Sequence, residues 1–130
     1  MNYTLRKAVE TKNEQALIES LDLSRQKTVD PTQYELIEEA LLGTWHSQHE
    51  DLVNMIYLEN LKDDRFINPI LKIALDGDVF RPYDDELEST LRKCVHALKT
   101  IDSVKANLAL IKLESLNNDN VKTTLDMYKK

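Results

Sequence analysis

A helical-hairpin pattern occurs twice in this chain, with the second copy 40 residues after the first. Each copy has two runs of apolar residues at helical spacing, separated by a short polar joint, Lys62-Asp63-Asp64 or Asp102-Ser103. The matching apolar positions are Leu58, Leu61, Phe66, Ile70, Leu71 and Ile73 in the first copy and Leu98, Ile101, Ala106, Leu110, Ile111 and Leu113 in the second. The pattern predicts helical hairpins that stack and bury each other's apolar faces.

The composition agrees with an all-α fold. Two glycines and three prolines among 130 residues are too few for the many turns of an all-β protein. A chain of this length fits one domain, so we expect residues 1–130 to form a single helical-repeat unit. The period suits a HEAT-like α-α superhelix of about eight helices in stacked hairpins.

Apolar spacing and capping residues place the expected helices. The ranges are 3–10, 14–22, 31–42, 47–61, 64–75, 84–100, 102–116 and 120–128, and Pro69 suggests that the fifth of them starts nearer Asn68. Gly43 is expected as a left-handed cap, and Ser47 with Glu50 has the spacing of a capping box. Asp102 is expected to begin the seventh helix, and 76–83 reads as a turn.

No group of residues has the spacing of a known catalytic or cofactor site. The two glycines are too far apart for a phosphate-binding loop. His46, His49 and Glu50 offer zinc-binding atoms, but their order differs from that of metalloproteases, and packing around Trp45 explains them better. Cys94 is expected in a buried stripe beside an exposed His96. We therefore expect no metal, no cofactor and no enzymatic activity.

Charge and apolar patterning narrow the partners and the compartment. Seventeen basic against 23 acidic residues give a net charge of -6, and the basic residues are scattered, which argues against direct nucleic-acid binding. No apolar run approaches a membrane span or a signal peptide. With a single cysteine, the chain is expected in the cytoplasm, away from membranes.

An acidic segment is the sharpest candidate for partner binding. Its carboxylates are interleaved with two aromatic residues, which suits a surface that steers a basic protein and offers contact area. The candidate residues are Asp76, Asp78, Phe80, Tyr83, Asp84, Asp85, Glu86 and Glu88. The alternative, which the sequence leaves open, is a solvated charged loop that also caps a helix.

Two segments carry a family resemblance. The first is Leu41-Leu42-Gly43-Thr44-Trp45-His46-Ser47-Gln48-His49-Glu50-Asp51-Leu52, and the second is His96-Ala97-Leu98-Lys99-Thr100-Ile101-Asp102-Ser103-Val104-Lys105-Ala106. Over about residues 34–115 the chain resembles the all-helical immunity proteins of bacterial polymorphic toxin systems. It is similar in particular to immunity family 30 and to HEAT-like immunity proteins of contact-dependent growth inhibition. The block formed by Trp45, His46, Ser47, His49 and Glu50 is the more specific part.

The resemblance implies a small antidote that binds one cognate toxin domain, often a nuclease, and blocks it in a tight one-to-one complex. A basic nuclease partner would suit the acidic charge of this chain. The alternative hypothesis is a HEAT-like adaptor or regulatory subunit that joins proteins without inhibiting them, through an exposed apolar groove. A third reading, an enzyme built on His46, His49 and Glu50, lacks a visible substrate pocket.

Overall fold

The computed structural model describes residues 2–24, 31–81 and 88–128, and these ranges contain nine α-helices and no β-strand. The predicted all-α class is confirmed. The helices are α1 (Asn2–Thr11), α2 (Glu14–Ser24), α3 (Tyr34–Leu42), α4 (His49–Leu58), α5 (Ile67–Leu75), α6 (Gly77–Phe80), α7 (Ser89–Ile101), α8 (Val104–Glu114) and α9 (Asp119–Asp126). Short 3-10 turns, Pro31–Gln33 and Asp64–Phe66, precede α3 and α5. None of the described helices has the length and apolar composition required to cross a bilayer.

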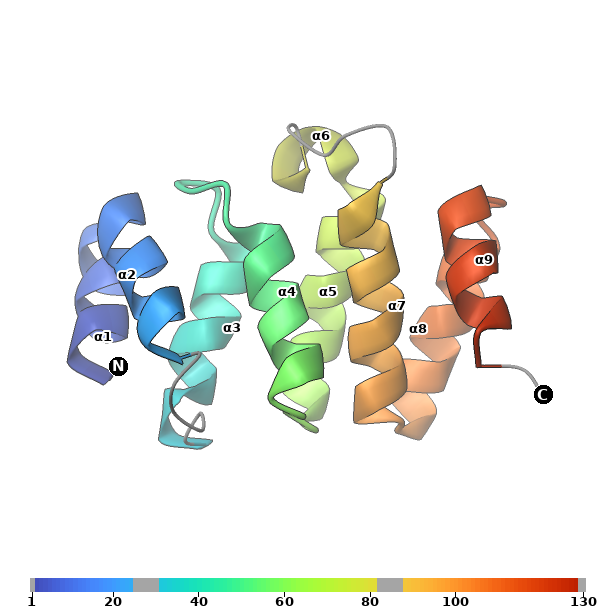
Figure 1. Ribbon diagram of the computed structural model, residues 1–130, viewed down its shortest axis with the longest axis horizontal. Helices are drawn as coiled ribbons and strands as arrows, with labels where there is room; N and C mark the ends of the chain where they lie inside the picture. The colour runs from blue at the N-terminus through green and yellow to red at the C-terminus, as the bar shows by residue number, and fades with distance from the viewer. Residues whose placement is uncertain (1, 25–30, 82–87, 129–130) are drawn as a thin grey trace.

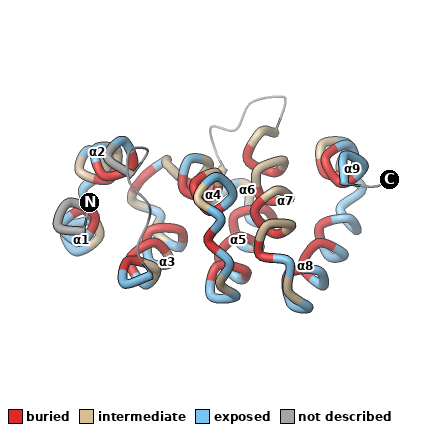
Figure 2. The backbone as a smooth tube through the Cα atoms, turned by 60° about the horizontal axis from the view of Figure 1, so that its bottom comes forward, coloured by how far each residue is buried: buried red, intermediate tan, exposed pale blue. Residues whose placement is uncertain are grey.

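The helices form an elongated stack of two layers, with the chain ends at opposite ends of the stack (Figures 1 and 2). One layer contains α1, α3, α5 and α8, and each of these packs against the next. The other layer contains α2, α4, α7 and α9, in which α7 packs against both α4 and α9. The described part has one more helix than expected, because α6 forms where a turn was predicted.

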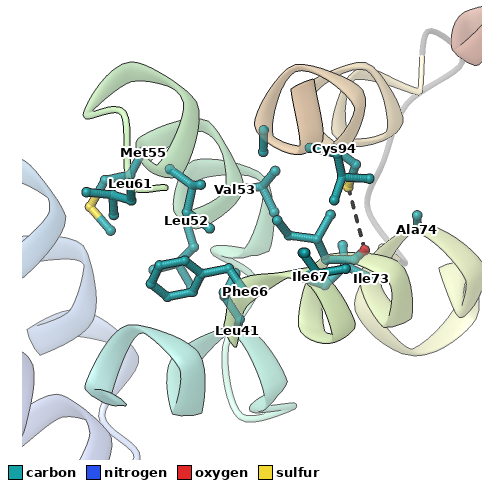
Figure 3. Packing of buried hydrophobic residues seen from close by; sticks show 14 of the residues in the cluster. Leu41, Leu52, Val53, Met55, Leu61, Phe66, Ile67, Ile73, Ala74 and Cys94 are labelled. Carbon is teal, nitrogen blue, oxygen red and sulfur yellow. Dashed lines mark hydrogen bonds between the residues drawn. The ribbon is translucent and has the colours of Figure 1, made fainter. Parts of the chain in front are cut away.

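Helix α5 lies at the centre of the stack and buries most of its apolar side chains, whereas Asn68, Lys72 and Leu75 are exposed. Phe66, Ile67, Ile70 and Ile73 have no exposed surface, and Figure 3 shows the labelled members of this group between α3, α4 and α7. Pro69 lies in the first turn of α5, as predicted, where its missing N–H breaks no helical bond. This helix connects both layers because it packs against α3, α7 and α8.

The apolar repeat correctly identifies most of the inward-facing positions. Four of the six matched pairs are buried in both copies, namely Leu61 with Ile101, Phe66 with Ala106, Ile70 with Leu110 and Ile73 with Leu113. Two positions differ from expectation, because Leu58 at the end of α4 is 66% exposed and Ile111 on α8 is 63% exposed. The stripe of α7 is confirmed at Leu91, Cys94, Val95 and Leu98, which are all buried.

Each of the two joints of the repeat contains a residue whose side chain caps the helical segment that follows. Asp63 Oδ1 accepts a hydrogen bond from the Arg65 backbone N–H at 2.9 Å, and Ser103 Oγ accepts one from the Ala106 N–H at 3.1 Å. Asp102 was predicted to begin the second helix of its hairpin, and that prediction is wrong. Asp102 ends α7 with φ of 49°, which leaves Ser103 to cap α8.

Several predicted boundaries also shift. Helix α2 continues to Ser24, and α8 ends at Glu114, two residues before the predicted end. Helix α7 begins at Ser89, and the predicted start of this helix at residue 84 lies outside the described residues. The predicted order of elements along the stack is otherwise retained.

Replacing Ser103 with Ala should lower the free energy of unfolding by about 1 kcal/mol, because the Ala106 N–H loses its acceptor. Asp102→Asn is the matched control, since asparagine tolerates the left-handed backbone and Asp102 does not cap α8. Urea unfolding followed by circular dichroism measures both. A larger loss for Asp102→Asn than for Ser103→Ala would contradict the cap assignment.

Candidate functional site

Four aromatic rings form a column between α4 and α6. His46 and His49 stack with ring centroids 4.3 Å apart and 24° between their planes. Trp45 meets His46 edge-on at 4.6 Å, and Phe80 of α6 meets His49 edge-on at 5.2 Å. We call Trp45, His46, His49 and Phe80 the aromatic column. It holds α6 against the start of α4.

Hydrogen bonds to the backbone fix both histidine rings. His46 Nε2 lies 2.7 Å from the Ala40 carbonyl oxygen, and His46 Nδ1 accepts from the Gln48 backbone N–H at 2.9 Å. His49 Nε2 lies 2.6 Å from the Gly43 carbonyl oxygen. Because a carbonyl oxygen only accepts, each ring carries its proton on Nε2. His46 packs against Trp45 as the sequence predicted, whereas the partners of His49 are His46 and Phe80.

The column favours neutral histidines. Both side chains are buried, and His49 Nδ1 has no hydrogen-bond partner among the described residues. Burial, with a smaller contribution from nearby His46, lowers the pKa of His49 from 6.5 to about 4. Burial also lowers the pKa of His46. Protonation of either ring would place a charge beside the other in a poorly hydrated site.

The predicted capping box between Ser47 and Glu50 is wrong. Helix α4 begins at His49, and the side chain of Gln48 at its N-cap makes no capping bond. Instead, Glu14 Oε2 of α2 accepts from the Ser47 backbone N–H at 2.7 Å, from Ser47 Oγ at 2.9 Å and from Gln48 Nε2 at 3.3 Å. The bond from the Ser47 N–H is the main reason why the pKa of Glu14 is lowered. Long-range bonds therefore replace the local cap.

Glu50 likewise bonds across the stack. Its Oε1 accepts from Ser89 Oγ at the start of α7 and from Lys93 Nζ at 3.0 Å. Burial opposes ionisation of Glu50, but the bonds from Ser89 and Lys93 outweigh it and lower the pKa of the carboxyl group. Glu14 and Glu50 together tie α2, the loop before α4, and α7 into one assembly.

Gly43 provides space for the column and is not the left-handed cap that was predicted. Its φ of -72° and ψ of 144° are extended. A Cβ atom at this position would lie 2.4 Å from Trp45 Nε1, well inside van der Waals contact. The glycine is required by the close approach of the indole ring.

The candidate partner-binding residues separate into four groups. Asp76 and Asp78 are exposed as expected, whereas Phe80 is buried in the aromatic column and offers no contact area at the surface, which corrects that expectation. Glu88 is half-buried and accepts hydrogen bonds from the side chains of Asn118 and Asn120, which ties α7 to α9. Tyr83, Asp84, Asp85 and Glu86 lie outside the described residues.

Three exposed residues at α6 define an edge of the stack that we call the acidic edge: Asp76, which directly precedes the helix, and Asp78 and Val79 within it. Val79 is 53% exposed, so it replaces Phe80 as the apolar member of this surface. The sequence pattern did not reveal Val79, because it predicted a turn at 76–83. Had a helix been predicted at 77–80, Val79 and Phe80 would have been expected on different sides of it. Asp51, also exposed, follows Glu50 in the first turn of α4.

The other candidate residues make packing contacts within the stack. In the described ranges, no group of three or more His, Cys, Asp or Glu side chains could hold a metal ion. Cys94 is buried and donates to the Ile70 carbonyl oxygen at 3.9 Å. His96, expected to be exposed, is half-buried and stacks on Tyr57 at 4.9 Å, with its Nδ1 2.5 Å from the Tyr128 hydroxyl oxygen.

Comparison with known proteins adds no assignment. No family model, no curated protein and no solved structure matches this chain.

Acidification should destabilise the protein through His49. In the unfolded chain His49 binds a proton near pH 6.5, but in the folded chain it does so only near pH 4. The contribution of neutral His49 to stability is therefore complete above pH 6.5 and is lost as the pH falls toward 4. From about pH 7 to about pH 5 the loss should be about 2 kcal/mol, and His46 adds to it. Urea unfolding across this range measures the slope. His49→Gln should flatten it, and an unchanged slope would contradict the assignment.

Gly43→Ala should destabilise the fold by about 1–3 kcal/mol, because the half-buried indole of Trp45 must move. In the double variant Gly43→Ala, Trp45→Leu the additional cost of the alanine should largely disappear, since the clashing ring is gone. Thermal unfolding of the four proteins of this cycle measures the coupling. If the destabilisations by Gly43→Ala and Trp45→Leu were additive, the indole ring would not be the reason why position 43 requires glycine.

Proposed function

We propose that this chain is an immunity protein that binds a cognate toxin domain in a tight one-to-one complex and neutralises it without catalysis. The toxin in this proposal is a basic nuclease of a contact-dependent growth inhibition system, met in the bacterial cytoplasm. The observation that carries the proposal is the acidic edge, where Asp76 and Asp78 are exposed beside Val79. The likeness of the Trp45–Glu50 block to immunity proteins supports the same reading.

The structure around the acidic edge suits tight binding. Phe80 anchors α6 in the aromatic column, so the adjacent carboxylates are presented on a preformed support. A preformed surface loses little conformational freedom on binding, which leaves more of the interaction energy for affinity. Exposed carboxylates attract a basic nuclease over several ångströms and occupy the place of the substrate phosphates.

An adaptor without inhibitory activity is the second candidate, and one observation favours it. Helix α8 exposes Val104, Leu108 and Ile111, which form an apolar face open to a partner. An adaptor would bind several partners with modest affinity, whereas an antidote would bind one partner tightly. Competition between retained partners distinguishes the two.

Neutralisation can be measured directly. The purified chain, used as bait in lysate of its source cells, should retain one basic partner in stoichiometric amount, and the RNA- or DNA-cleaving activity of that partner should disappear when the chain is added. A partner that stays fully active beside a molar excess of the chain would refute the antidote function. Several weakly retained partners would favour the adaptor.

Asp76→Asn with Asp78→Asn should slow association with that partner about tenfold at low salt, because two steering charges are removed. Folding should be unaffected, since both side chains are exposed. Glu35→Gln with Glu39→Gln makes the same change of charge on the exposed side of α3 and is the control. Stopped-flow binding measures the rates, and equal rates for the two double variants would place the interface elsewhere.

A further inference from the structure

Helix α6 is a single helical turn at the upper edge of the stack (Figure 1). It directly follows α5 and packs on it. Phe80 fastens it to His49 at the start of α4, and of the four residues of α6 Phe80 is the buried one. The Arg81 guanidinium, next in sequence, donates to the Ile73 and Ala74 carbonyl oxygens at 3.0 and 3.1 Å. A single turn is unstable by itself in water, so α6 depends on these contacts.

The contact between Phe80 and His49 requires a neutral imidazole. His49 Nε2 already donates its proton to the Gly43 carbonyl oxygen at 2.6 Å, and His49 Nδ1 has no partner among the described residues. A second proton would go to Nδ1, where a buried cationic N–H group would lack an acceptor. His49 is also the first residue of α4, where the positive end of the helix dipole disfavours a cation. The geometry therefore opposes protonation while the aromatic column is closed.

The charges around the stacked pair single out His49 as the proton sensor. Glu14 of α2 favours a proton on His46, whereas the charge that acts on His49 is that of His46, which disfavours one. A proton on His46 is thus partly balanced in the closed column, and one on His49 is not. The other charged groups of the described elements around the pair are bound elsewhere or exposed: Glu50 and Lys93 to each other, Arg81 to the end of α5, and Asp51, Asp76 and Asp78 to solvent.

Of the two helices that meet at this contact, α6 has less packing to lose. Helix α4 is anchored in the core by Leu52, Val53 and Ile56, which have no exposed surface. Helix α6 contributes Phe80 alone to the core. Elements with few buried apolar contacts open locally at a lower cost than the whole chain unfolds. A charged His49 would therefore reach water by separating from Phe80, while α4 stays in place.

We propose that the stacked pair His46 and His49 is a proton-sensitive latch on α6. When His49 Nδ1 takes up a proton, the ring leaves the aromatic column, Phe80 loses its partner, and α6 detaches from the start of α4. The other helices stay packed, but the acidic edge loses its fixed position. The consequence for toxin binding rests on the proposed function, whereas the detachment of α6 does not.

Hydrogen exchange of the free chain tests the latch without a partner. The amides to follow are those of residues 79–81, whose N–H groups bond to the carbonyl oxygens of Asp76 and Gly77. From about pH 7 to about pH 5, after correction for the intrinsic effect of pH, their opening should increase about twentyfold, because His49 regains its ordinary pKa once the column opens. The Ile70 amide of α5 should stay better protected. Dilute urea should change the opening of α6 little, since local opening exposes little surface.

Two glutamine variants separate the latch from other effects of acid. His49→Gln should abolish the increase, whatever the opening of α6 at neutral pH, because glutamine binds no proton. His96→Gln is the matched control, since it removes a histidine that stacks on Tyr57 away from the column, and it should leave the increase unchanged. The comparison of α6 with α5 needs no variant.

Several results would overturn the latch. Equal opening free energies and equal urea sensitivity for α6 and α5 at about pH 5 would show that acid acts only by unfolding the whole chain. An opening of α6 that is the same at both pH values, or an increase that His49→Gln retains, would exclude His49 as the proton sensor. Because the toxin is absent from this experiment, each of these results leaves the proposed antidote function untouched.

Discussion

The burial of α5 is the constraint on which the rest of the structure depends. Ile67, Ile70 and Ile73 have no exposed surface, and the helix packs against α3, α7 and α8, which come from both layers. Interiors of this kind are close-packed, so a change of volume in α5 would shift the neighbours on either side. The position of α6, which directly follows α5, is set by the same packing.

Polar contacts fix the positions of α2, α4 and α7 relative to one another, in addition to the apolar packing. Glu14 joins α2 to the loop before α4, and Glu50 joins α4 to α7. The stacked pair His46 and His49 completes the joint with Phe80 of α6. These contacts require ionised carboxylates and neutral histidines together, and the folded chain keeps His49 neutral down to about pH 4, although its stability already falls below the ordinary pKa of histidine. The acidic edge owes its fixed position to this joint.

The sequence predicts what depends on periodicity and misses what depends on tertiary contacts. The apolar period identified the all-α class and buried positions such as Ile70 and Leu110, because burial of one helix face is a local pattern. Ser47 and Glu50 have the spacing of a capping box, yet their bonds go to Glu14 and Lys93, residues distant in sequence. Phe80 was expected at the surface because nothing near it in sequence reveals the ring of His49.

Carboxyl footprinting of the complex tests the central claim that the acidic edge meets the partner. Carbodiimide coupling followed by mass spectrometry would compare each exposed carboxylate in the free chain and in the chain bound to its retained partner. Asp76 and Asp78 should lose reactivity on binding, while Glu35 and Glu39 on α3 should keep theirs. Unchanged labelling of Asp76 and Asp78 in a saturated complex would contradict the account and place the interface on another face.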